Sequence, residues 1–493
     1  MVWAMSATIT LDRELGGPLT QQIANRLRDA IAAGALAPGA RLPSARSLAG
    51  QLGVARGTVD AAYAMLAGEG TLEPRGPAGT IVSKALSERP APVQRPMPFV
   101  ARPQAAANMA LPFRMGLPAL DAFPRKLWST LSVRAMRGIA TADLAYPDPA
   151  GHWPLREAIA AYLGVSRGIV CTAEQVLITG GFQGALTLAA HLLVRPGDPV
   201  WIEDPGYPPA RQALEAAGAR LVPVRVDQDG IRVAAAISSA PRAKLAVVTP
   251  THQCPLGVGL TLPRRLALLA WAADAGGWVL EDDYDSEFRY TGHRLPALKS
   301  LDRAGRVLYV GSFSKVLFPG LRLGYLVAPD ELSVALQRAL RLLQWGQPVP
   351  PQRAVAAFMT EGHFGRHLRR MRTLYAARRR ALAEALGATF ADRVTIELAA
   401  GGMHLLARFT GTMDDGTLAR RAAEAGLGPT ALSALAIAHD CGQGLLLGFT
   451  NIAESDAMAL ARRLRAAIDG AGQFTEYAAK TAGDGDDNRR RTG

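Results

Sequence analysis

Cysteine is scarce in this sequence. The 493 residues include only Cys171, Cys254 and Cys441, and no two of them are close together. Isolated cysteines exclude a disulfide framework and the paired spacing of a zinc site, so we expect reduced thiols and no bound metal. The sequence also shows no internal repeat and no GxSxG motif, which argues against a repeat array and against the usual serine hydrolases.

Long apolar runs are missing as well. A helix needs roughly 18 consecutive apolar residues to cross a bilayer. The longest candidate, residues 266–280, is interrupted by Asp274 and by a pair of glycines. The N-terminus shows no basic segment followed by an apolar stretch and a cleavage site. These absences predict a cytoplasmic protein that makes no membrane contact.

The chain is nevertheless long and rich in apolar residues. A single hydrophobic core stops growing at roughly 250 to 300 residues, so a chain of 493 residues predicts at least two domains. Hydrophobic residues make up 49% and charged residues 20%, which is typical of a soluble globular protein. The net charge of +13 favours an anionic partner without identifying one.

Residues 12–83 contain the pattern of a helix-turn-helix followed by a hairpin. The first predicted helix ends near Gly34 and has apolar residues on one face, at Ile23, Leu27 and Ile31. A second helix is expected after Ser44, which suits an N-cap, and a third from Arg56, with the tight turn GVA between them. Residues 71–83 have the Gly/Pro spacing of a short hairpin, which would form a wing.

The placement of a few side chains suggests a DNA-binding surface. Arg56 and Thr58 stand at the start of the predicted third helix, where side chains reach base edges in a major groove. Arg46 on the preceding helix is placed to pair with a phosphate. The helix spacing alone also fits a three-helix bundle that contacts another protein, so both interpretations stay open on that evidence.

The motif is more specific than the spacing. The run RLPSARSLAGQLGVARGTVDAAYAML, followed by GPAGTIV, resembles the winged helix-turn-helix of the GntR superfamily. The resemblance implies that Arg46, Arg56, Thr58 and the wing residue Gly79 contact DNA. Many relatives have Ser or Thr where this chain has Gly57, so one contact is expected to be missing.

Beyond this module the sequence changes character. Residues 84–108 are rich in proline and are expected to form an extended spacer. Residues 109–470 alternate apolar strand-like runs with helical ones, which predicts an α/β domain with a mainly parallel sheet covered on both faces. Residues 471–493 are polar and are predicted to be disordered.

Polar groups gather where the predicted strands end, which is where such sheets bind ligands. The candidates for a cofactor site are Gly181, Phe182, Gln183, Tyr207, Asp282, Tyr284, Ser312, Ser314, Lys315 and Arg322. They supply an amine, an acid, a phenol and an anion cradle, which pyridoxal 5'-phosphate requires. In this interpretation Lys315 forms the Schiff base after Arg322 lowers its pKa, Asp282 pairs with the pyridine nitrogen, and Tyr284 donates to the ring oxygen.

The remaining candidates would hold the phosphate or cover the ring. Tyr207 could stack on the ring, and the phosphate would be held by the amides of residues 181–183 and by Ser312, Ser314 and Arg322. Taken singly, each member also has an ordinary structural explanation, such as a loop carboxylate for Asp282 or a solvated amine for Lys315. The combination is far more specific than any member.

The segments EDPGYPP, EDDYDSEF and SFSKVLFPGLRLGY resemble the fold-type I aminotransferases, and the agreement extends over most of residues 110–465. A GntR-like module fused to such a domain is similar to the MocR subfamily of bacterial regulators. The resemblance implies a smaller C-terminal α+β subdomain and a large domain that senses an amine, an amino acid or pyridoxal phosphate itself. It also implies a head-to-tail homodimer that binds double-stranded operator DNA.

Two departures bear on catalysis. Aminotransferases usually carry an asparagine where this chain has Cys254, and a carboxylate-binding arginine where it has Leu446. Without a bidentate clamp an amino acid is bound and oriented less well, so efficient transamination is not expected unless Arg408 substitutes. The alternative, an active aminotransferase with an accessory DNA-binding domain, stays open.

An arginine-rich stretch lies outside these motifs. Residues 341–380 contain nine arginines and a single acid, Glu361. We expect a solvated or dimer-contacting face, with a second DNA-facing surface as the alternative.

Overall fold

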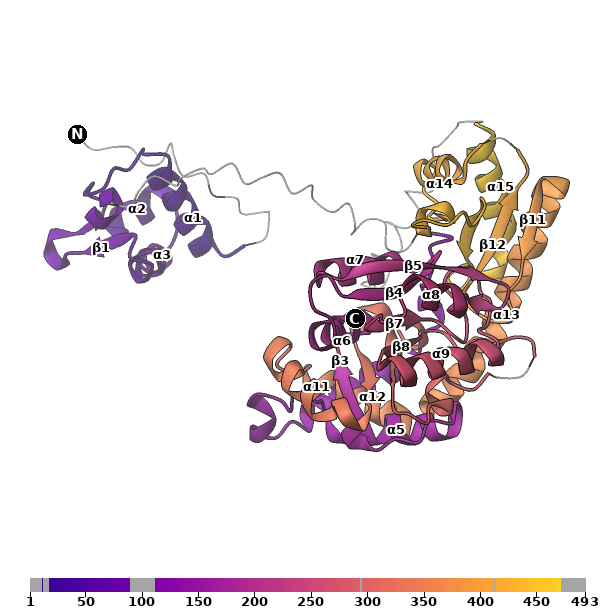
Figure 1. Ribbon diagram of the computed structural model, residues 1–493. Helices are drawn as coiled ribbons and strands as arrows, with labels where there is room; N and C mark the ends of the chain where they lie inside the picture. Colours follow the sequence, from indigo (N-terminus) through magenta and orange to yellow (C-terminus); the bar gives the residue numbers. More distant parts are fainter. Residues whose placement is uncertain (1–10, 12–16, 89–110, 293–294, 412, 471–493) are drawn as a thin grey trace. The chain divides into compact units, whose positions relative to one another are not determined.

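The chain divides into two compact units after Pro103. The computed structural model in Figure 1 describes residues 11, 17–88, 111–292, 295–411 and 413–470. Most of the predicted linker and all of the predicted tail, residues 471–493, lie outside the described residues. No helix in the described part of the chain is both long enough and apolar enough to span a bilayer.

The small unit is a helix-turn-helix with a wing. Its elements are α1 (Leu19–Ala32), α2 (Ala45–Leu52), α3 (Arg56–Gly68), β1 (Leu72–Pro74) and β2 (Thr80–Val82). The Ser44 hydroxyl accepts from the Ser47 amide at 3.2 Å, which caps α2, and Gly53 ends α2 in the left-handed conformation. β1 and β2 pair as an antiparallel hairpin. The predicted winged helix-turn-helix is therefore confirmed.

One apolar core holds this unit together. The side chains of Ile23, Leu27, Leu48, Val59 and Leu66 are fully buried and come from all three helices. The chain then forms a 3-10 helix, η3 (Lys84–Glu88), whose Leu86 packs against the same core. The packed module thus continues a few residues beyond residue 83.

The large unit is built on a twisted sheet. Within the described residues this sheet has eight strands in the order β3-β10-β9-β8-β7-β4-β5-β6. Their bounds are β3 (Val176–Thr179), β4 (Pro199–Asp204), β5 (Arg220–Asp227), β6 (Gly230–Ile231), β7 (Leu245–Val248), β8 (Trp278–Asp283), β9 (Val307–Ser312) and β10 (Gly324–Val327). The neighbouring pairs β9–β8, β8–β7, β7–β4 and β4–β5 are parallel. Toward the two edges, β10 runs antiparallel to both β3 and β9, and β6 runs antiparallel to β5. The predicted α/β fold with a mainly parallel sheet is confirmed.

Helices cover both faces of this sheet, as Figure 1 shows. The helices used below are α4 (Arg125–Arg137), α5 (Trp153–Arg167), α6 (Phe182–Leu193), α7 (Pro208–Ala216), α8 (Val233–Ser239), α9 (Leu262–Ala275), α11 (Asp330–Leu343) and α12 (Val349–Thr360). Successive residues of β3 enter different cores: Leu177 packs with residues of α6 and α11, whereas Ile178 packs with residues of α5 and α12. A strand that is buried on both sides explains the continuous apolar run in the sequence.

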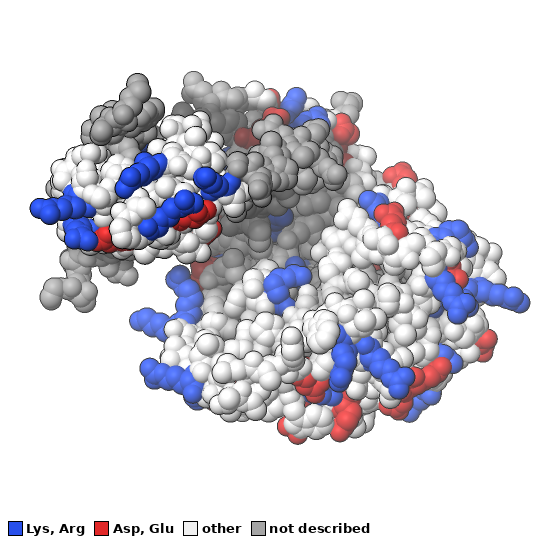
Figure 2. All heavy atoms as spheres, turned by 90° about the vertical axis from the view of Figure 1, so that its left-hand side faces the viewer, with Lys and Arg blue, Asp and Glu red and all other residues white. Residues whose placement is uncertain are grey.

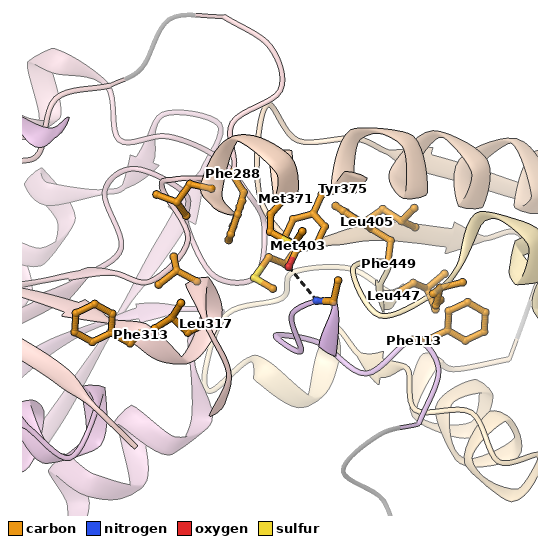
Figure 3. Close-up of a cluster of buried hydrophobic side chains, with 14 of the residues drawn as sticks. Phe113, Phe288, Phe313, Leu317, Met371, Tyr375, Met403, Leu405, Leu447 and Phe449 are labelled. Carbon is orange, nitrogen blue, oxygen red and sulfur yellow. Dashed lines mark hydrogen bonds between the residues drawn. The ribbon is translucent and has the colours of Figure 1, made fainter. Parts of the chain in front are cut away.

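A smaller sheet and three helices form a second substructure of the large unit. Its strands are β11 (Val394–Glu397), β12 (His404–Phe409), β14 (Leu445–Gly448) and β13 (Thr430–Ala431), in that order, and its helices are α13 (His363–Phe390), α14 (Asp415–Glu424) and α15 (Ala457–Asp469). Tyr375 of α13 packs against Phe288 in a core that reaches Phe449, and its hydroxyl accepts from the Ala119 amide at 3.0 Å (Figure 3). This is the α+β arrangement expected for the C-terminal subdomain.

The arginine-rich stretch is divided between two roles. Arg378 is buried, pairs with Asp121 and donates to the Thr450 carbonyl at 2.6 Å. Arg353 pairs with Asp143 at 2.7 Å. Other arginines of α13 are exposed: Arg366, Arg369, Arg370 and Arg380. Part of the stretch therefore makes internal contacts, and these four arginines lie at the surface.

Candidate cofactor and DNA sites

A cavity of about 610 Å³ lies at the carboxyl ends of β8 and β9. Residues predicted to hold a cofactor line it, namely Phe182, Gln183, Tyr207, Asp282, Tyr284, Ser312, Ser314, Lys315 and Arg322. Gly181 is adjacent, since a Cβ placed on it would lie 3.9 Å from the guanidinium of Arg322. The parallel strands bring these residues together because their carboxyl ends share one edge of the sheet.

Lys315 lies on a short helix, α10 (Phe313–Val316), that follows β9 directly. Its Nζ donates to the Gly116 carbonyl at 2.8 Å. Burial lowers the pKa of the Lys315 amine, acidic neighbours such as Asp282 oppose this, and Arg322 lowers it further. Burial is a larger cause than Arg322, to which the sequence argument had assigned the effect. A larger neutral fraction is what a nucleophilic amine needs.

Asp282 is the last residue but one of β8 and lies beside this amine in an enclosed position. Its side chain is buried, and its Oδ1 has no hydrogen-bond partner among the described residues. Burial raises the pKa of Asp282 well above its usual range, and the charges of Asp283 and Asp285 raise it further. A buried carboxylate oxygen without a partner is costly, and a protonated ring nitrogen would satisfy it. The residues present therefore fit a pyridinium group.

Tyr284 belongs to a buried hydrogen-bond network. Its hydroxyl lies 2.9 Å from Nδ1 of His252, which also lies 3.0 Å from Oδ2 of Asp285. The carboxylate of Asp285 can only accept, so we place the ring proton of His252 on Nδ1, where it is shared between Asp285 and the Tyr284 oxygen. In that assignment the Tyr284 oxygen accepts from His252, so the proton of Tyr284 is left to donate to another group, and Tyr284 lines the cavity.

The anion cradle is formed by α6 and Arg322. Gly181 is the N-cap of α6, with φ 81°. The first backbone amides of a helix have no partners within the helix, so they are available to an anion. Arg322 donates to the Gly180 carbonyl at 3.1 Å, and its own backbone is left-handed, with φ 52°. Gly324 permits this approach, because a Cβ there would lie 2.8 Å from the Cα of Gly181. The positive end of a helix and a guanidinium thus converge on one side of the cavity.

Tyr207 stands at the cavity wall next to Phe182. Their ring centroids are 6.0 Å apart in an edge-to-face arrangement. The Tyr207 side chain is 41% exposed, and burial of its hydroxyl raises the pKa of Tyr207 to about 12. Its ring is available to cover a flat group in the cavity.

The two departures from the aminotransferase pattern occupy different places. Cys254 lines the cavity, and burial raises the pKa of its thiol. Leu446 is buried in a small apolar cluster with Leu406 and Leu432. Arg408 lies outside the cavity lining, where it pairs with Glu397 at 2.5 Å and donates to carbonyls of the loop before β14. Arg408 therefore does not stand in for the missing clamp.

Sequence reasoning missed several residues of this site. Arg114 and Gly116 line the cavity from the segment that precedes α4, and His404 lines it from β12. His252 lies behind Tyr284. No local pattern marks the segment that holds Arg114 and Gly116 as part of a site. By contrast, His252 and the glutamine that follows it lie in the connection after strand β7, and two polar residues beyond a strand end could have pointed to the site.

The predicted DNA-contacting residues lie on the surface of the small unit. Arg56 is the first residue of α3, its side chain is 70% exposed, and its Nε lies 3.3 Å from Asp60. Arg46 is exposed on α2, and Thr58 is partly exposed in the first turn of α3. Gly79 in the wing has φ 90°, and a Cβ there would lie 3.1 Å from Arg41.

Basic charge is not gathered into one large patch on the face that Figure 2 shows. On the face in Figure 2, basic side chains are scattered among acidic and uncharged ones. The argument for DNA binding therefore rests on the placement of particular arginines in the helix-turn-helix.

Comparisons with known proteins find both modules. Residues 19–82 match the bacterial regulatory proteins of the gntR family, and residues 125–434 match the class I and II aminotransferases. The probable rhizopine catabolism regulatory protein MocR of Rhizobium meliloti is 38% identical over 460 residues, covering 90% of this chain and 92% of that protein. The HTH-type transcriptional regulator TauR of Rhodobacter capsulatus is 38% identical over 75% of this chain and 80% of its own.

A solved structure agrees with the large unit. LysN, the α-aminoadipate aminotransferase of Thermus thermophilus, is 31% identical with a TM-score of 0.67, over 73% of this chain and 92% of its own. That structure holds N-(5'-phosphopyridoxyl)-L-leucine, a compound of the cofactor with an amino acid.

Proposed function

This chain belongs to the MocR-type regulators, which join a GntR-family helix-turn-helix to a class I and II aminotransferase domain, and from that premise we propose how it works. Its small unit binds operator DNA, and its large unit holds pyridoxal 5'-phosphate and senses an amine, an amino acid or the cofactor itself. A regulator that acts on bacterial DNA works in the cytoplasm, the compartment predicted above.

One observation carries the proposal for the large unit. A lysine amine with a lowered pKa and a buried carboxylate oxygen without a described partner line the same cavity as the Arg322 guanidinium. These groups match the aldehyde, the ring nitrogen and the phosphate of pyridoxal 5'-phosphate.

Each group has a separate task. The bound cofactor supplies an aldehyde that exchanges between amines and a ring that withdraws electrons. Lys315 offers a neutral amine, Asp282 keeps a proton on the ring nitrogen, and Tyr284 donates to the ring oxygen. Arg322 and the start of α6 bind the phosphate, and Tyr207 covers a face of the ring.

The His252 network gives a prediction for Tyr284. In the His252→Leu variant, Tyr284 loses the donor that polarises its hydroxyl, so its hydrogen bond to the cofactor's ring oxygen weakens. A ring oxygen with a weaker hydrogen-bond donor beside it would be more basic. We expect the pH midpoint of the bound cofactor's absorbance change to rise by up to about one unit, the equivalent of roughly one hydrogen bond.

A double-mutant cycle isolates this effect. In a Tyr284→Phe background, His252→Leu should shift the midpoint no further, because the shift passes through the Tyr284 hydroxyl. Equal shifts in both backgrounds would show that His252 acts by another route.

Titration with amines tests sensing against catalysis. A panel of amino acids and 2-oxo acids should change the absorbance of the bound cofactor without releasing product over many turnovers. Repeated turnover would instead favour an aminotransferase with an accessory DNA-binding domain. Cys254 in the cavity and Leu446 in the core support the sensor, because neither supplies the amide or the clamp expected of an aminotransferase.

A head-to-tail homodimer is also proposed. The large unit exposes a group of apolar side chains: Leu144 is 76% exposed, Tyr146 86%, Leu342 70% and Trp345 61%. The ring centroids of Tyr146 and Trp345 lie 5.6 Å apart, so these two exposed side chains adjoin each other. Monomeric soluble proteins seldom expose such patches. A monomeric mass by light scattering at micromolar concentration would contradict the dimer.

Arg56 provides the test of the DNA interface. Arg56→Ala should weaken operator binding by roughly 1 to 3 kcal/mol, which is the value of a good base contact. A gel-shift series at fixed salt measures the loss and should show relaxed preference at one base pair. Arg26→Ala, an exposed arginine on α1 outside the helix-turn-helix pair, is the matched control and should retain sequence preference. Equal losses in both variants would place the base contact elsewhere.

A further inference from the structure

The loop that carries Tyr207 is attached to the C-terminal subdomain by a buried carboxylate. Asp204 is the last residue of β4 and is fully buried. Its Oδ1 accepts from the Ile437 amide at 2.7 Å. Its Oδ2 accepts from the Ala438 and His439 amides at 2.8 and 2.9 Å. Hydrogen bonds from backbone amides to a carboxylate are charge-assisted and strong, and we call these three bonds the Asp204 tether.

A second contact between the same two segments lies next to the cavity. The Gly206 amide donates to the Leu435 carbonyl at 3.1 Å. Leu435 ends the short helix η10 (Ser433–Leu435), and both Leu435 and Tyr207 line the cavity. The Asp204 tether therefore fixes Tyr207 relative to the part of the cavity wall that the C-terminal subdomain supplies.

A sharp turn separates the tether from Tyr207. A Cβ placed on Gly206 would lie 2.3 Å from the Glu203 carbonyl oxygen, so the chain turns tightly at this glycine. On the other side of the turn, the Gln253 side chain donates to the Pro205 carbonyl at 2.9 Å. Because the turn is short and held from both sides, a displacement at the tether is passed on to the Tyr207 ring.

We infer that Asp204 is a positioning residue for the cofactor, and that the bound cofactor in turn orders the loop of residues 437–439. The inference rests on the proposed function, in which the Tyr207 ring covers the cofactor. Asp204 is not among the described residues that line the cavity, so it acts on the cofactor through Tyr207. If the tether favours cofactor binding, the cofactor must stabilise the tether by the same factor, because coupling between two sites is reciprocal.

Cofactor affinity measures one side of this coupling. Cofactor-free, full-length protein is titrated with pyridoxal 5'-phosphate, and the absorbance of the bound cofactor gives its dissociation constant. Asp204→Asn keeps the size of the side chain but removes its charge and one of its two acceptor oxygens. We expect the affinity to fall about 3- to 10-fold, the range that one aromatic ring contact contributes. In a Tyr207→Leu background the same substitution should lower the affinity less than about twofold.

Hydrogen exchange measures the other side and needs no variant. The amides of Ile437, Ala438 and His439 exchange when the tether opens, so their rates report the stability of the tether. In the wild type we expect them to exchange about 3- to 10-fold more slowly with the cofactor bound than without it. In Asp204→Asn the cofactor should change these rates less than about twofold.

Asp302 provides the matched control. It is a partly buried aspartate whose carboxylate accepts from the Ala304 and Val307 amides at 3.1 and 2.8 Å. Val307 begins β9, at the end of the strand away from the cavity. Asp302→Asn should lower stability in urea without changing cofactor affinity, and the exchange of these two amides should not depend on the cofactor.

The failures are distinguishable. The inference is overturned, while cofactor binding stands, if Asp204→Asn keeps the wild-type affinity or loses it equally in both Tyr207 backgrounds. It is also overturned if the three amides exchange at the same rate with and without the cofactor, a comparison that decides even if Asp204→Asn does not fold. If the wild type shows no absorbance change with pyridoxal 5'-phosphate, the proposed cofactor function is itself overturned, and this inference falls with it.

Discussion

Replacing Lys315 with alanine is expected to abolish the near-visible absorbance band that purified protein shows when its cofactor is attached to lysine. The cofactor aldehyde then has no amine to attach to, because Lys315 is the cavity-lining residue with a primary amine among the described residues. The phosphate and ring contacts made by Arg322 and Asp282 remain, so the cofactor can still bind reversibly and should be lost on desalting. A spectrum before and after desalting measures both effects.

The fold should survive this change. Among the described residues, the Lys315 side chain donates to the Gly116 carbonyl, and Lys315 is not part of the surrounding hydrophobic cores. Lys126→Ala, an exposed lysine on α4, is the matched control and should keep the wild-type spectrum. An unchanged band in Lys315→Ala would mean that another amine carries the cofactor, and the sensing account would have to be abandoned.

The parts of the site that could be predicted lie where local sequence signals agree. Asp282 and Lys315 stand at or just after the ends of two buried strands, β8 and β9, and the apolar runs before them mark the strand ends. Parallel pairing of β8 with β9 then brings those ends to one edge, which a sequence argument can anticipate.

Arg114 shows why the rest could not be predicted. It is an exposed arginine in an irregular segment, and locally it resembles any surface arginine. It reaches the cavity because β14, more than 300 residues later, holds that segment through the bond between Phe113 and Gly448. Contacts of this separation leave no local pattern.

Strand direction and side-chain direction explain two further differences. β10 follows β9 after the residues from Phe313 to Leu323, which include α10, and this is shorter than the crossover that a parallel pair normally needs. The antiparallel β10 could therefore have been predicted. Arg408 pairs in register with Thr395 of β11, toward the edge of the smaller sheet, whereas an arginine that substituted for the clamp would have to face the cavity.

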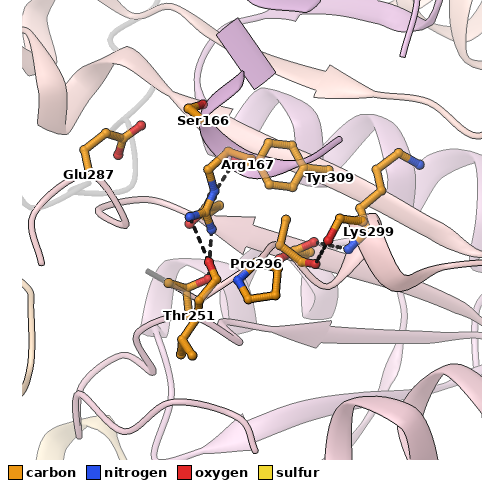
Figure 4. Close-up of polar contacts among 12 residues, drawn as sticks. Ser166, Arg167, Thr251, Glu287, Pro296, Lys299 and Tyr309 are labelled. Carbon is orange, nitrogen blue, oxygen red and sulfur yellow. Dashed lines mark hydrogen bonds and ion pairs between the residues drawn. The ribbon is translucent and has the colours of Figure 1, made fainter. Parts of the chain in front are cut away.

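A second polar cluster, behind the cofactor site, was not predicted at all. Arg167 ends α5, is buried, and lies with its Nε 2.8 Å from Oδ2 of Asp283. Its guanidinium also donates to the Thr251 hydroxyl at 3.0 Å, as Figure 4 shows. The Tyr309 hydroxyl donates to the same Asp283 oxygen at 2.5 Å. Burial alone would lower the pKa of Arg167, but the charge of Asp283 raises it above its usual value.

Removing this guanidinium is expected to cost more stability than any exposed ion pair. Arg167→Leu leaves the Asp283 carboxylate buried without its charge partner, and breaking a buried pair in this way costs about 3 to 5 kcal/mol. Urea unfolding measures the loss, and tryptophan fluorescence follows the large unit, which holds six of the seven tryptophans. Arg393→Gln is the matched control, since Arg393 and Asp469 are 43% and 32% exposed and such pairs contribute at most about 1 kcal/mol.

Adding Asp283→Asn to Arg167→Leu should restore part of the stability, because the unpaired charge is then gone. The cofactor site should respond as well. Asp283 already raises the pKa of its neighbour Asp282, and without Arg167 its charge is less compensated. The pKa of Asp282 would then rise further, so Asp282 would more often be protonated and less often be the carboxylate that pairs with the ring nitrogen. Cofactor affinity should therefore fall in Arg167→Leu and recover in the double variant. A stability loss under about 1 kcal/mol, or a double variant no more stable than the single, would show that the pair does not support the site in this way.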